Sequence, residues 1–169
     1  MGSKEMKVTA VNPETGEMAE LEVGQEMLEQ LKNLSNTSTD QATLNRHIDN
    51  LDLSADAKLL MTSIGNQVIR AGELVINIGR KIIEAVLFIA SQIPNASIGL
   101  ILGLLVGALI GSIPFIGWIL GPFATVIASV FGVVMGGMED LKDRAIARKI
   151  DLVRAEFDVL KGEISVVSE

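Results

Sequence analysis

The chain lacks, or has very few of, the side chains on which most catalytic and metal sites depend. Its 169 residues contain no cysteine, no tyrosine and a single histidine. Without cysteine, disulfides and thiolate metal sites are excluded. The sequence also offers neither an acid pair nor a glycine-rich phosphate loop between a strand and a helix. We therefore expect no enzyme activity, no metal, no cofactor and no small-molecule substrate.

Basic and aromatic residues are also sparse. There are 14 lysines and arginines against 21 acidic residues, for a net charge of −7, and the aromatic residues are one tryptophan and five phenylalanines. Nucleic-acid binding depends on a basic patch with interleaved aromatic side chains, and no stretch has one. We expect no nucleic-acid partner. Met1 to Lys7 carries charges of both signs with no apolar core after it, so we also expect no signal peptide.

The most informative absence is that of charge from Ala85 to Met138, a run of 54 residues without Asp, Glu, Lys, Arg or His. Nearly half of the chain is hydrophobic (49%), and its mean hydropathy is +0.42. A bilayer core of roughly 30 Å requires about 20 apolar residues per crossing, whereas a helix at the surface of a soluble protein has one face in water. The run is long enough for two crossings and predicts a lipid bilayer as partner and a membrane location.

Within residues 95–138 we predict a hydrophobic helical hairpin. Its two apolar arms, Ala96 to Ile113 and Phe115 to Met135, are separated at Pro114. The segment between the arms is itself apolar, and we expect its tip to include Pro114, Trp118 and Pro122. A tryptophan there would suit a membrane interface.

Both arms carry glycines at intervals of four. A small residue at every fourth position leaves one helix face free of side chains, so that another helix can approach closely. The hairpin arms could pack on each other in this way or on copies of themselves, and we predict a homo-oligomer. The expected helix contacts are Gly99, Gly103, Gly107 and Gly111 in the first arm and Gly132 and Gly136 in the second.

Basic residues lie on both sides of the charge-free run. We expect them to be interfacial anchors, and the positive-inside rule places both ends of the hairpin on the same side of a membrane. These residues are Arg80 and Lys81 before the run and Lys142 and Arg144 after it.

The remaining segments complete a mostly α fold with a small N-terminal β-hairpin. Residues 1–25 alternate in character around a turn-forming Asn12 to Glu17 and predict the β-hairpin, with strands Lys7 to Val11 and Met18 to Val23. Residues 26–53 predict short helices and a polar linker. Residues 54–94 have apolar positions at intervals of three and four after a candidate N-cap, Ser54, and predict one long amphipathic helix or two nearly collinear ones.

Two further patterns concern helix packing. Gly65, Gly72 and Gly79 recur at intervals of seven in the predicted long helix and indicate close backbone contact with a neighbour, or else three kinks. Residues 139–169 predict a C-terminal amphipathic helix, whose seam would pack on a partner helix. The seam residues are Ile146, Ile150, Val153, Phe157, Leu160 and Ile164.

From about Ser54 onward the layout resembles the pore-forming domain of colicin-type bacteriocins. In that family a hydrophobic helical hairpin near the C-terminus is sheathed by amphipathic helices and followed by one more helix. Here the hairpin is Ala96 to Met135, and the next helix is expected from Glu139. The hairpin is similar, too, to those of type III secretion translocators and of bilobed inclusion-membrane proteins. The resemblance implies membrane insertion.

Three interpretations of the hairpin remain open at this point. The first, which we favour, is a membrane-inserting protein that forms a homo-oligomeric pore or ion channel, as in a toxin, either integral to the membrane or inserted after release in a soluble form. The alternative is a structural oligomer, a component of a tube, virion or ejection channel, with the hairpin buried between subunits. In the third, the hairpin is the permanent core of a soluble helical domain.

Overall fold

The computed structural model describes residues 5–37, 39–93, 97–132 and 144–167. The chain is mostly helical with a small antiparallel β-sheet, as the sequence predicts. The helices are α1 (Leu28–Ser35), α2 (Gln41–Asp49), α3 (Ala55–Gly65), α4 (Ile78–Gln92), α5 (Ile98–Ser112), α6 (Pro114–Phe131) and α7 (Arg144–Glu156). Short 3-10 turns cover Gln25–Met27 and Asp158–Leu160.

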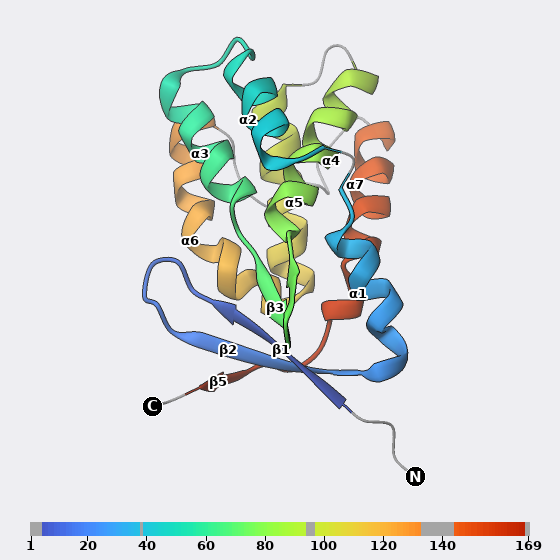
Figure 1. Ribbon diagram of the computed structural model, residues 1–169. Helices are drawn as coiled ribbons and strands as arrows, with labels where there is room; N and C mark the ends of the chain where they lie inside the picture. The colour runs from blue at the N-terminus through green and yellow to red at the C-terminus, as the bar shows by residue number, and fades with distance from the viewer. Residues whose placement is uncertain (1–4, 38, 94–96, 133–143, 168–169) are drawn as a thin grey trace.

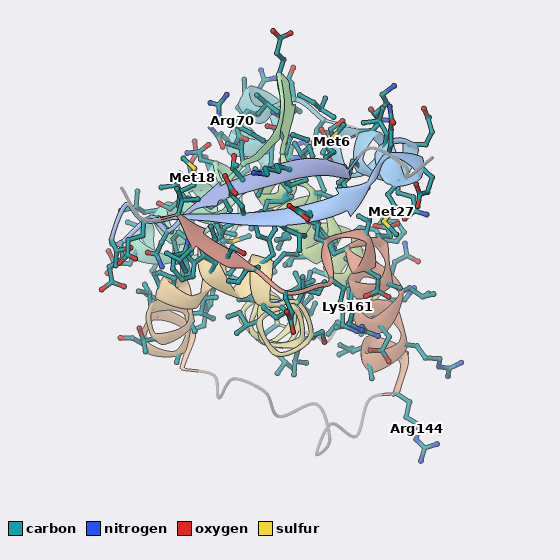
Figure 2. The ribbon with its side chains drawn as sticks, turned by 90° about the horizontal axis from the view of Figure 1, so that it is seen from below. Met6, Met18, Met27, Arg70, Arg144 and Lys161 are labelled. Atoms are coloured by element: carbon teal, nitrogen blue, oxygen red, sulfur yellow. The ribbon has the colours of Figure 1, made fainter. Side chains whose placement is uncertain are left out.

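The sheet contains the strands β1 (Glu5–Val11), β2 (Met18–Gly24), β3 (Ile69–Ala71), β4 (Leu74–Ile76) and β5 (Ser165–Val167). Its order is β4-β3-β1-β2-β5. Figure 1 shows the β1–β2 ribbon below the helices, whose axes lead away from it. Seen from below in Figure 2, several helices are viewed nearly end-on behind the strands. The sheet therefore closes one end of a helical bundle.

The predicted N-terminal β-hairpin is confirmed. Val8 pairs with Leu21 and Ala10 with Ala19, and all four side chains are buried under the helices. The turn is closed by a hydrogen bond from the Asn12 N–H to the Glu17 carbonyl at 2.8 Å. Such a two-stranded unit is marginal alone, and here it is stabilised by pairing with β3 and β5 and by packing on helices.

The predicted short helices of residues 26–53 are observed as α1 and α2. The polar connection between them ends at Asp40, whose carboxylate accepts a hydrogen bond from the Thr43 N–H at 2.7 Å and so caps α2. That bond, together with the Thr43 side chain, lowers the pKa of the Asp40 carboxyl below its usual value. The predicted N-cap Ser54 is also confirmed, because its Oγ accepts from the Ala57 N–H at 3.1 Å.

The expectation of one long helix, or of two nearly collinear ones, over residues 54–94 is wrong, because α3 and α4 pack side by side. The segment forms α3, the hairpin β3–β4 and α4. Gly72 takes a left-handed φ of +61° at the turn of this hairpin, which a glycine adopts without strain. Because β3 pairs with β1, a long-range contact overrides the local helical spacing of the apolar residues.

The close backbone contact predicted from Gly65 and Gly79 exists, but it joins two helices rather than marking one face of a single helix. The start of α4 lies against the end of α3, where the Gly79 N–H bonds the Gln67 carbonyl at 3.0 Å. A Cβ on Gly79 would lie 1.9 Å from the Ile64 carbonyl oxygen. Only glycine allows this approach.

The C-terminal helix is shorter than predicted. In the described residues it runs from Arg144 and ends at Glu156, and the chain then forms a 3-10 turn and the edge strand β5. Leu160 and Ile164 therefore do not belong to a helical seam. The chain changes direction at Gly162, which has a positive φ. The segment 165–167 that follows contains two valines, which favour a strand, and it pairs with β2.

Candidate membrane-active hairpin

The two predicted apolar arms are observed as α5 and α6, which pack on each other and are joined by Ile113 alone. Ser97 begins α5 by accepting a hydrogen bond from the Leu100 N–H at 3.0 Å. Pro114 is the first residue of α6, where its fixed φ and missing N–H favour a helix start. The expected tip with Pro114, Trp118 and Pro122 is therefore wrong for two of its three residues, because Trp118 and Pro122 lie within α6 and only Pro114 lies next to the turn.

Helix α5 is the centre of the molecule. The helices α4, α6 and α7 pack around it. Most of its residues are buried, namely Gly99, Ile101, Leu102, Gly103, Leu104, Leu105, Val106 and Leu109. Figure 1 shows α5 surrounded by these other helices. The most apolar helix of the chain is thus shielded from water by helices of its own chain.

Helix α6 is less well covered. The helix packs on α5, α3 and the sheet. Its buried residues are Phe115, Ile116, Ile119, Leu120 and Ile127, whereas Val126 is 42% exposed. Within the described residues, α6 is the one helix long and apolar enough to cross a membrane, with a mean hydropathy of 1.7 over 18 residues. Helix α5 is equally free of charge but has 15 residues.

The first turns of α6 are bound to the β1–β2 turn through Trp118. The Trp118 indole N–H donates to the Glu17 carbonyl at 3.1 Å, and the Asn12 side-chain amide donates to the Trp118 carbonyl at 3.1 Å. That carbonyl would bond the N–H of residue 122 in a regular helix, but Pro122 has none. The Asn12 amide therefore takes the place of the missing helical donor. We call this pair of hydrogen bonds the turn contact.

The turn contact was not foreseen from the sequence, which placed Trp118 and Pro122 at a free tip. A signal for it exists: a proline inside an apolar helix leaves a carbonyl without a partner, and such a group must find another donor when it is shielded from water. Asn12, in a turn, is a candidate donor. The sequence around Trp118, however, does not show which side-chain amide of the chain is the donor.

The glycines of α5 and α6 differ in what they contact. A Cβ on Gly99 would lie 2.5 Å from the Phe131 ring, so this glycine is a helix contact as predicted. Gly103 is buried and Gly107 half-buried. Gly111 has open space around it, and Gly132 ends α6 with a left-handed φ of +69°, so neither forms the predicted helix contact within the chain. Gly136 lies outside the described residues.

The expected interfacial anchors Arg80 and Lys81 hold α1 and the α1–α2 connection on α4. The Arg80 Nη1 donates to the Thr37 hydroxyl at 3.2 Å, and the Lys81 Nζ donates to the Asn33 carbonyl at 3.0 Å. The Lys81 ammonium also lies 3.8 Å from the Glu156 carboxylate of α7. Their charges are therefore engaged in packing the helices together in this fold. Of the other two, Arg144 is exposed at the start of α7, and Lys142 lies outside the described residues.

The seam predicted for the C-terminal helix does find partner helices. Ile146 and Ile150 are buried and Val153 is half-buried on α7, which packs on α5 and α4. Phe157 and Leu160 are also buried beyond the end of α7, and the 3-10 turn that contains Leu160 packs next to β2. Helix α7 therefore covers one side of α5. We call α4 and α7, the helices outside the hairpin that cover α5, the sheath.

A groove runs between α3 and α6. Its volume is about 600 Å³. It is lined by Pro13, Glu14, Asp56, Leu59, Leu60, Ser63, Pro122, Phe123, Thr125, Val126 and Val130. We call it the α3–α6 groove.

Neither the remaining chemistry nor known proteins indicate another site. In the part of the chain that the structure describes, no three His, Cys, Asp or Glu side chains are grouped so that they could hold a metal ion. No family model matches the chain, and no curated protein or solved structure matches it either. The candidate site therefore rests on the hairpin and its surroundings.

Proposed function

We propose that this chain is a membrane-inserting α-helical protein that forms a homo-oligomeric pore, and that the fold described above is its state before insertion. The observation that carries the proposal is the hairpin α5–α6, two antiparallel helices without one charged residue. A soluble protein has little reason to keep charge off α6, which is only partly covered. A helix that enters lipid must be free of charge.

The hairpin can be stable both in the folded protein and in a lipid bilayer. In lipid, apolar residues near a helix centre contribute about −0.3 to −0.6 kcal/mol each, and a central charge costs about 2.5–3.5 kcal/mol. In the fold, the same side chains are buried by α3, α4, α7 and the sheet. The helices α4 and α7 each have one apolar and one polar face, so after release they can lie at the membrane surface.

In the proposed mechanism, insertion begins with separation of α6 from the β1–β2 turn. The turn contact consists of two hydrogen bonds, each worth about 0.5–1.5 kcal/mol net. That cost is small beside the gain from an uncharged hairpin in lipid. Once α5 has left the other helices, Gly103 and Gly107 can join the already open Gly111 in a face that is available to other copies, which is the proposed basis of the pore.

The chain carries its own probe of insertion. Trp118 is the single tryptophan and there is no tyrosine, so the emission of the protein reports on the hairpin. We would add the lipid-free protein to vesicles whose acyl chains carry bromine, which quenches tryptophan that enters the bilayer, and record dye release in parallel. Quenching together with release supports the proposal. An unquenched Trp118 and intact vesicles would support the interpretation of the hairpin as a permanent core.

A charge placed on an exposed position of α6 separates insertion from folding. Val126→Lys adds a charge where the side chain already meets water, so the fold should be kept, but in the bilayer it costs about 2.5–3.5 kcal/mol. We expect vesicle release to slow on the order of a hundredfold. The matched control is Phe88→Lys on α4, which is 61% exposed and outside the hairpin, and we expect it to keep most of the activity.

The homo-oligomer is tested at Gly111. Because a Cβ there meets nothing within 4 Å, Gly111→Leu should not disturb the fold, yet it blocks the glycine face. We expect vesicle binding to be kept while cross-linked oligomers and dye release are lost. Unchanged oligomers would exclude assembly through this face.

The alternative function, a structural oligomer with the hairpin buried between subunits, needs a second copy to cover α5. Helices of the same chain already do so. The membrane proposal is therefore preferred.

A further inference from the structure

The α3–α6 groove is apolar along its walls and acidic at its rim. Leu59 and Val126 are 67% and 42% exposed on its two sides. The charged residues among its described lining are Glu14 and Asp56, both acidic and both exposed. In the described part of the chain neither carboxylate has an ion-pair partner. The groove therefore suits an apolar side chain that lies next to a basic one.

The exposed face of α7 has that arrangement. Leu152 is 71% exposed, the largest exposure among the big apolar residues of the described chain. Arg144 and Arg148 precede it at intervals of four, are exposed, and have no ion-pair partner among the described residues. Residues four apart lie on one face of a helix, so α7 presents an apolar side chain in line with two positive charges. Figure 2 shows Arg144 pointing away from the molecule.

The groove and this face also match in spacing. Asp56 is three residues from the exposed Leu59 and four from the buried Leu60 on α3, and Arg148 is four residues from Leu152 on α7, so both spacings are about one helical turn. A helix lying in the groove parallel to α3 would bring Arg148 next to Asp56 when Leu152 lies between Leu59 and Val126.

We infer that α7 of a second copy of this chain docks in the α3–α6 groove, with Leu152 in its apolar centre and Arg148 paired with Asp56. The two surfaces lie on opposite sides of the molecule: Figure 1 has α3 and α6 on the left and α7 on the right, and Figure 2 separates α6 and α7 in the same way. The association is head-to-tail, and each copy offers one surface of each kind. Such a contact forms a ring where its rotation closes and a filament where it does not.

This inference concerns lipid-free protein and does not rest on the proposed function. The experiment is sedimentation equilibrium over a range of protein concentrations at low ionic strength. We expect the average mass to rise with concentration, and the rise to weaken in high salt because the paired charges lie at an exposed rim. Asp56→Arg or Arg148→Asp alone places like charges together and should weaken association at least tenfold.

Mixing these two variants is the decisive test. Within each variant, the groove and the α7 face carry charges of the same sign and repel each other. In the mixture, the groove of one variant and the α7 face of the other carry opposite charges, so association should return. Glu22→Arg, an acidic reversal on the exposed sheet face, is the matched control and should leave association unchanged. Leu152→Ser should weaken it, with the thermal unfolding midpoint kept.

A protein that stays monomeric at every concentration overturns the inference, whatever else fills the groove. The inference is also overturned if neither charge reversal weakens association, or if association does not return in the mixture of the two variants. Vesicle release measured on the same variants is a separate result, so loss of the docking contact and loss of membrane insertion can be told apart.

Discussion

Pro122 lies well inside α6, where its ring removes a backbone donor and leaves the Trp118 carbonyl without its helical partner. The chain supplies a substitute from 106 residues away, the side-chain amide of Asn12. Asn12 has two functions there, because its Oδ1 also accepts from the N–H groups of Glu14 and Thr15 and so holds the β1–β2 turn. One side chain therefore couples the geometry of a turn to that of a helix.

This coupling predicts a double-mutant result. Asn12→Asp keeps the acceptor that holds the turn but loses the donor to Trp118, and we expect it to lower the free energy of unfolding by about 1 kcal/mol. In a Pro122→Ala background the restored N–H serves the Trp118 carbonyl, so the same change should cost less than half as much. Urea unfolding followed by circular dichroism measures both. Equal costs in the two backgrounds would show that Asn12 does not replace the missing donor.

Asp40 gives the prediction for pH. Its pKa is lowered in the fold, first by the Thr43 backbone N–H and then by the Thr43 side chain. A carboxyl with a lowered folded pKa adds stability that is fully present above its unfolded value, about 3.9, and is lost as the pH falls through the folded value.

In Asp40→Asn the amide oxygen can still cap α2 but does not titrate. We therefore expect wild type to lose more of its free energy of unfolding than Asp40→Asn between about pH 6 and about pH 3. Urea titrations of both proteins at the two values provide the comparison. Parallel losses in the two proteins would mean that the Asp40 cap does not contribute to the acid sensitivity.

At the scale of elements, local patterns predicted those segments whose partners are close in sequence. The β1–β2 hairpin, α1, α2 and the two arms of the hydrophobic hairpin all follow from periodicity, and the start of α3 follows from its capping residue Ser54. The β3–β4 hairpin did not, because the apolar residues of 68–78 fit helical spacing as well, and only pairing of Ala71 with Val8 decides for a strand. The edge strand β5 was missed for the same reason.

The candidate site could be predicted in part. The absence of charge identified the hairpin, and its helical arms are observed. The turn contact and the engagement of Arg80 and Lys81 with α1 could not be predicted, because each depends on which distant segment the fold brings near. Glycine spacing likewise indicated close packing without showing which glycines take part.

Two glycines give a matched prediction at this scale. Gly79→Ala would place a Cβ on the Ile64 carbonyl where α3 meets α4, and separating the two backbones should cost about 1–3 kcal/mol or more. Gly111→Ala adds a methyl group in open space on a helix and should stabilise by about 0.5–1 kcal/mol. Thermal unfolding of the two variants should therefore shift in opposite directions. A stabilised Gly79→Ala protein would disprove the close contact of α3 with α4.

At the scale of the whole molecule, the sheath and the bilayer compete for the same apolar surface. Helix α5 is covered by α4 and α7 as well as by its hairpin partner α6, and its apolar contacts with α4 and α7 must be given up before the hairpin can enter lipid. The rate of insertion should therefore depend on how firmly the sheath is packed, and not only on how apolar the hairpin is. A variant that weakens the sheath without touching the hairpin distinguishes these two contributions.

Ile150 offers such a variant, because it is fully buried on α7, which packs against α5. Ile150→Ala should destabilise the fold by about 2–5 kcal/mol. If the proposed function holds, it should also speed dye release from vesicles, since less work is needed to free α5. Phe88→Ala on the exposed face of α4, the other helix that covers α5, is the control and should change neither quantity much. A destabilised Ile150→Ala protein that releases dye more slowly than wild type would mean that the folded sheath takes part in membrane activity rather than opposing it.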